Sequence, residues 1–133
     1  MAGVAGADPH ITIRTAKDNS HTVTEPESKK LEGVMRQTIE RLVAEAPIKL
    51  DANRNVDASL ISLTTDISDK TIVVNATLKV VVSDDDGRIT SVLGGSAKVE
   101  ASKRSQVALL REDAIQSAIE SGYVKVKQQL ASK

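Results

Sequence analysis

The chain has 133 residues, which fits one domain, and a globule of this size buries roughly two thirds of the surface of its unfolded chain. Lysine plus arginine and aspartate plus glutamate both total 18, so the formal net charge is zero and no global field attracts nucleic acid or an anionic membrane. Cysteine, phenylalanine and tryptophan are absent and Tyr123 is the only aromatic residue, which excludes disulfides, thiolate catalysis and cysteine-based metal sites and leaves no stacking platform for single-stranded nucleic acid.

The first eight residues carry no periodic pattern. Ala5-Gly6-Ala7 resembles the small-residue end of a cleaved export signal, although the charged and apolar regions of such a signal do not precede it. We expect residues 1–8 to be a flexible N-terminus or the remnant of an export signal, and residues 9–133 to form a single α+β domain. The remnant interpretation slightly favours a periplasmic or secreted location over the cytoplasm. No stretch approaches the roughly 20 apolar residues of a membrane span.

The pattern next predicts a short strand over residues 10–15, followed by a polar loop over residues 17–24. Thr24 and Glu27 then have the spacing of a capping box and indicate the start of a helix. Pro47 predicts its end. The apolar side chains of this helix recur at three- and four-residue steps and form one stripe, made of Leu31, Val34, Met35, Ile39, Leu42, Val43 and Ala46.

Two strands follow a predicted linker over residues 48–57. The first covers residues 60–65, and Ser68-Asp69-Lys70 forms the turn to the second, over residues 71–82, which has the clearest alternation in the chain. One face of the second strand is apolar and is expected to face the core, with Ile72, Val74, Ala76, Leu78, Val80 and Val82.

A hairpin at residues 84–87, where Gly87 supplies a positive φ, leads to a return strand over residues 88–101. Gly94-Gly95 is expected to bend or bulge this strand. The residues predicted on its core face are Ile89, Leu93, Ala97, Val99 and Ala101.

The last helix starts at Ser102 or Ser105 and keeps an apolar stripe almost to the end of the chain. Gly122 costs up to about 1 kcal/mol in a helix interior, so a break there that docks Tyr123-Val124 separately is an expectation. The order β-α-β-β-β-α therefore predicts an α+β fold. We expect an antiparallel three-stranded meander, with the N-terminal strand as an optional edge strand and two long helices on one face.

Oxygen-bearing side chains recur at every second position of one segment, as in a calcium loop: Asp51, Asn53, Asn55 and Asp57. Val56 replaces the turn glycine of such a loop and Ser62 replaces its bidentate glutamate. A calcium-binding structural domain is therefore one alternative function, and the other interpretation of this segment is a polar linker. We assign no metal ligands.

Catalysis has few candidate residues. His10 and His21 are the only imidazoles, and neither a second-histidine spacing for zinc nor a nucleophile elbow is present. Gly94-Gly95 lacks the spacing of a phosphate loop. The sequence therefore predicts a protein that is not an enzyme and has no cofactor.

A helix, three strands and a helix follow one another in double-stranded RNA-binding domains, which this chain resembles in that order. The resemblance implies a basic cluster at the start of the last helix, where this sequence has Lys98, Lys103, Arg104 and Arg111. The dense lysine signature of that family is missing, so nucleic acid is disfavoured as a partner and stays an alternative.

The same order with a preceding strand is similar to small periplasmic lipoproteins that assist outer-membrane assembly or transport, including the lipopolysaccharide-transport lipoproteins. The similarity covers nearly the whole chain as architecture. It implies an exported adaptor of the envelope, although the lipid-bearing cysteine of such proteins is absent.

The leading hypothesis is a non-catalytic protein-binding or adaptor module, whose partner is another protein. Both helices need the same sheet face, so the opposite face is left for a partner or for solvent. Its mixture of valines with polar residues suits a modest interface. The residues predicted to bind the partner are Val73, Asn75, Thr77, Lys79, Val81 and Val92.

Overall fold

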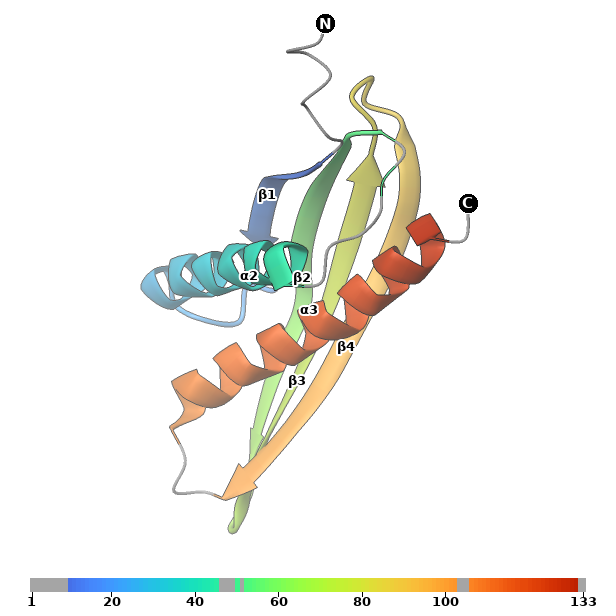
Figure 1. The fold of residues 1–133 in the computed structure, drawn as a ribbon. Coiled ribbons are helices and arrows are strands. Elements are labelled where there is room, and N and C mark those ends of the chain that lie inside the picture. The colour runs from blue at the N-terminus through green and yellow to red at the C-terminus, as the bar shows by residue number, and fades with distance from the viewer. Residues whose placement is uncertain (1–9, 46–49, 51, 103–105, 132–133) are drawn as a thin grey trace, which may run out of the picture.

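The computed structural model describes residues 10–45, 50, 52–102 and 106–131. The predicted order β-α-β-β-β-α is confirmed (Figure 1). The elements are β1 (Ile11–Asp18), α2 (Glu25–Glu45), β2 (Arg54–Ile67), β3 (Thr71–Ser83), β4 (Ile89–Ser102) and α3 (Val107–Ala131). The predictions for residues 1–8 and for Pro47 lie outside the described residues.

The sheet has four strands in the order β1-β2-β3-β4 and is mixed, whereas the sequence predicted an antiparallel one. β2, β3 and β4 form the expected antiparallel meander, and β1 pairs in parallel with β2. The parallel pairing follows from α2, because a helix between two strands returns the chain to the end of the sheet where it started. β1 continues to Asp18, so it takes in the start of the predicted loop, and β2 begins at Arg54, within the predicted linker.

Both helices cover the same face of the sheet, as predicted (Figure 1). The alternation of β3 places the predicted core-face residues under the helices, and these six side chains are at most 6% exposed. The stripe of α2 contributes Leu31, Met35 and Ile39 to this core. From α3 the core receives Leu110, Ala114, Ile115, Ala118 and Ile119.

The connection between β1 and α2 is held by one carboxylate. Asp18 Oδ1 accepts hydrogen bonds from the backbone N–H of Ser20 at 2.9 Å and from the hydroxyl of Ser20. Its other oxygen accepts a bond from the hydroxyl of Ser28 in the first turn of α2, at 2.7 Å. His21, at the centre of this connection, has a positive φ of 57°. Asp18 therefore joins the end of a strand to the start of a helix.

α2 begins directly after Thr24, as the capping pattern predicted, and the N–H of Ser28 donates to the Thr24 carbonyl at 2.8 Å. Glu27 was expected to reach back to Thr24, but its carboxylate accepts hydrogen bonds from Nη1 of Arg111 at 2.8 and 3.0 Å. Nε of Arg111 donates to the hydroxyl of Thr65 at 3.2 Å. This half-buried arginine thus ties α3 to both α2 and β2.

The prediction that Ile89 lies on the core face is wrong. The pairing of β3 with β4 shifts between Val82 and Ser83, so that Ser83 lies opposite Ile89 and Val82 opposite Ser91, with Thr90 as the extra residue. An extra residue in one strand reverses which face every later side chain takes. Ile89 is consequently 63% exposed, and Ser91 is buried in its place.

Gly94-Gly95 does not produce the expected bulge, because the register is continuous there. Instead, Gly95 lets α3 lie directly on β4. A Cβ atom at Gly95 would come within 2.3 Å of the Ala118 carbonyl oxygen. Gly122 faces Gly95 at the same contact, and α3 runs through it without the predicted break. None of the helices in the described ranges is both long and apolar enough to cross a membrane.

Candidate functional site

The face of the sheet opposite the helices is the broadest surface without a structural partner among the described residues, and we call it the open face. All six residues predicted to bind a partner lie on it. At its centre, Thr77 of β3 lies between Ser62 of β2 and Ser96 of β4. The centre of the open face is therefore lined by short polar side chains, which leave the strands accessible there.

Apolar side chains interrupt the polar lining at several places. Val81 lies directly opposite Val92 in the neighbouring strand, and Val92 is 54% exposed. Ile89 extends this pair toward the β3–β4 hairpin. On β2, the register shift between Leu60 and Ser62 leaves Ile61 46% exposed. These side chains provide contact area that water solvates poorly.

Sequence reasoning missed Ile89 and Ile61 as members of the open face. Each is at a register shift. Strict alternation assigned Ile89 to the wrong face, and no face was predicted for the strand that contains Ile61. One feature of the sequence could have indicated the irregularity near Ile89. The alternation that places Ile89 in the core also places Ser91 there, and a buried hydroxyl without a hydrogen-bond partner is unfavourable.

The segment considered for calcium is used to hold strands together. The amide of Asn53 donates to a carboxylate oxygen of Asp85 at 3.2 Å, and the amide of Asn55 donates to the Asp84 carbonyl at 3.2 Å. Asp57 accepts a hydrogen bond from the Thr15 hydroxyl at 2.7 Å. Asp51 lies outside the described residues, within which no cluster of three or more histidine, aspartate or glutamate side chains could hold a metal ion.

The cations considered for RNA have different environments. Lys98 is exposed on the open face, whereas Arg111 is engaged by Glu27 under the helices. Lys103 and Arg104 lie outside the described residues. Of the two placed cations, only Lys98 is therefore available to a phosphate backbone.

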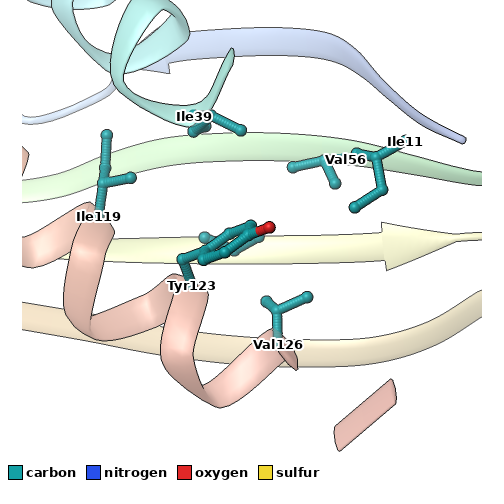
Figure 2. A pocket seen from close by; sticks show the side chains of 7 residues that line it. Ile11, Ile39, Val56, Ile119, Tyr123 and Val126 are labelled. Carbon is teal, nitrogen blue, oxygen red and sulfur yellow. The ribbon is translucent and has the colours of Figure 1, made fainter. Parts of the chain in front are cut away.

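A small apolar pocket lies under α3, around the ring of Tyr123 (Figure 2). Its volume is about 20 Å³, which is close to the space of a single water molecule. Burial raises the pKa of the Tyr123 phenol above its ordinary value. The lining side chains come from every layer of the fold: Ile11, Ile39, Val56, Val80, Ile119, Tyr123 and Val126. The pocket is too small for a substrate or cofactor and belongs to the core.

A shallow polar groove of about 170 Å³ lies between the two helices, beside Val34, Gln37, Thr38, Arg41 and Gln116. Its ends are marked by ion pairs that join the helices, Lys30 with Glu112 at 3.4 Å and Arg41 with Glu120 at 3.7 Å. Exposed pairs of this kind contribute little free energy. The groove holds no arrangement of a nucleophile and a base.

No protein-family model and no curated protein sequence matches this chain. Several solved structures match nearly its whole length. A proposed lipoprotein from Caulobacter crescentus has a TM-score of 0.59 at 11% identity, over 92% of this chain and 88% of that one. A dodecameric variant of PelC from Paraburkholderia phytofirmans has a TM-score of 0.52 at 13% identity, over 86% of each chain. A hypothetical protein from Chlamydia trachomatis has a TM-score of 0.53 at 9% identity, over 96% of this chain and 100% of that one. At these identities the chain shares the fold of these proteins.

Proposed function

We propose that this chain is a non-catalytic binding module that engages another protein through its open face. One observation carries the proposal: exposed valine and isoleucine side chains lie among serines, threonines and asparagines on a sheet surface that the helices leave uncovered. Interfaces of modest affinity have this mixture of apolar and polar area.

We further propose that the chain is an accessory protein of the bacterial envelope. The support is the shared fold with the proposed lipoprotein from Caulobacter crescentus. The dodecamer formed by PelC supports protein binding, because a chain of this fold assembles there through its protein surfaces.

Two matched valines allow a direct test. Val92 on the open face is 54% exposed and Val124 on the solvent side of α3 is 53% exposed, so Val92→Lys and Val124→Lys remove nearly the same exposed apolar area. We expect Val92→Lys to abolish retention of a specific protein from an envelope extract of the source organism, because a lysine amine in the interface must lose its hydration. Val124→Lys should retain that protein as the wild type does.

Quantitative mass spectrometry of the retained proteins provides the measurement, and circular dichroism melting curves establish that both variants fold. Retention that falls equally in the two variants, or in neither, would place the interface elsewhere and refute the proposal.

A further inference from the structure

β4 is an outer strand of the sheet, and it is long for an edge, running from Ile89 to Ser102. The outer edge of such a strand presents backbone N–H and C=O groups that can pair with another strand. In an antiparallel pair, alternate residues turn these groups toward the neighbour and away from it. Nζ of Lys125 reaches the Gly94 carbonyl from α3 at 2.8 Å, which indicates that Gly94 turns its backbone groups to the outer edge. The same alternation turns out Ser96, Lys98 and Glu100.

α3 shields only part of this edge, because it crosses the sheet diagonally (Figure 1). At one level of the sheet Thr65, Val74 and Val99 lie side by side, and there Arg111 of α3 contacts Thr65, two strands away from the edge. Further along, α3 reaches β4 at Gly95, and Lys125 covers the Gly94 carbonyl. The backbone from Ser96 to Ser102 is thus the open part of the edge.

The side chains on this open part are self-complementary in charge. Lys98 and Glu100 are exposed on the open face, two residues apart, and within the described part of the chain neither side chain forms a hydrogen bond or ion pair. An antiparallel second copy that places Val99 opposite its own Val99 brings Lys98 opposite Glu100, and Glu100 opposite Lys98. Opposite charges directly across an antiparallel pair stabilise it, whereas like charges destabilise it.

We propose that β4 pairs with β4 of a second copy of this chain, antiparallel and centred on Val99. In this register Lys98 and Glu100 exchange both backbone hydrogen bonds across the dimer, since both turn their backbone groups outward. Ser96 pairs with Ser102 in the same way. The two sheets then form one continuous sheet, whose two open faces lie side by side.

Charge reversal tests the register. Lys98→Glu places two glutamates opposite each other at both symmetry-related positions, and Glu100→Lys does the same with lysines. Each variant alone should dissociate with a dimer Kd raised about tenfold. The double variant with both reversals restores the complementary pairs and should dimerise as the wild type does. An equimolar mixture of the two single variants should form a heterodimer.

Sedimentation velocity over a range of protein concentrations measures these equilibria, and melting curves verify that each variant is folded. A wild-type chain that stays monomeric at millimolar concentration would overturn the proposal. If both single variants dimerise as strongly as the wild type, the register centred on Val99 is wrong. The binding of a separate partner to the open face involves Val92 and not this edge, so the two proposals can fail independently.

Discussion

At the scale of single residues, Asp18 has a greater structural role than its place at the end of a strand indicates. Burial alone would raise the pKa of this carboxyl group, but the hydrogen bonds from Ser20 and Ser28, helped by nearby His21, lower it below the ordinary value of 3.8. Hydrogen bonds to a charged acceptor are among the stronger ones in proteins. The charged form of Asp18 therefore stabilises the β1–α2 connection.

A lowered pKa in the folded state has a defined consequence for stability. The folded chain holds the proton of Asp18 less tightly than the unfolded chain does, so the stabilisation is present above a pH of about 3.8 and is lost as the pH falls through the lower, folded-state pKa. We expect Asp18→Asn to reduce the free energy of unfolding by about 1 kcal/mol at pH 6. Urea unfolding at pH 6 and pH 2.5 measures the difference between variant and wild type. It should shrink at the lower pH, and a difference that is the same at both values would contradict this role.

The residue scale is also where the sequence was least informative. Periodicity predicted the buried face of β3 correctly because the extra residue at each register shift lies in a neighbouring strand, Ile61 in β2 and Thr90 in β4. It failed for Ile89, since the position of an extra residue depends on how two distant strands pair and not on the local pattern. Glu27 was assigned to a local cap because its long-range partner Arg111 is 84 residues away in the chain.

At the scale of elements, the contact between β4 and α3 depends on two glycines with unequal roles. An alanine Cβ at Gly95 would be 2.3 Å from the backbone oxygen of Ala118, so the helix would have to move away from the sheet. At Gly122 the nearest atom to an added Cβ is the Gly95 Cα at 3.8 Å, which is an ordinary contact. The sequence predicted a bend or bulge at Gly94-Gly95 and a helix break at Gly122, whereas the close approach of helix and strand requires only Gly95.

The two alanine variants should therefore have different effects on stability. We expect Gly95→Ala to lower the free energy of unfolding by about 2 kcal/mol, as overpacking does. Gly122→Ala should leave it unchanged or raise it by up to about 1 kcal/mol, because alanine has the higher helix propensity. Urea denaturation followed by far-UV circular dichroism gives both values. Equal losses in the two variants would show that the helix needs both glycines.

Most of the element order could be predicted because the two helices and the β3 strand have strong periodic patterns. The capping residue Thr24 and the hairpin at Gly87, with its φ of 86°, were also predicted from local chemistry. The local pattern of β1 did not indicate its parallel pairing with β2, since eight residues with a polar and apolar alternation fit either direction. The mixed sheet is a consequence of the connection through α2, which is a property of the whole chain.

At the scale of the whole molecule, the fold divides its surface into two kinds. The helices cover one face of the sheet and form the core with it. On that side Arg111 of α3 forms an ion pair with Glu27 of α2 and a hydrogen bond to Thr65 of β2, so it holds the three elements together. No other element among the described residues covers the opposite face (Figure 1). Its predicted binding residues could be placed on one face by alternation alone, whereas the position of Ile89 required the three-dimensional register.

The most direct test of the central claim is site-specific photocrosslinking in cells of the source organism. A photoreactive residue at Thr77, in the centre of the open face, should form a discrete crosslinked product with one protein partner. The same residue at Leu109, which is 52% exposed on α3, should not form that product. If Leu109 gives the same product as Thr77, or if Thr77 gives none, the open face is not the binding surface.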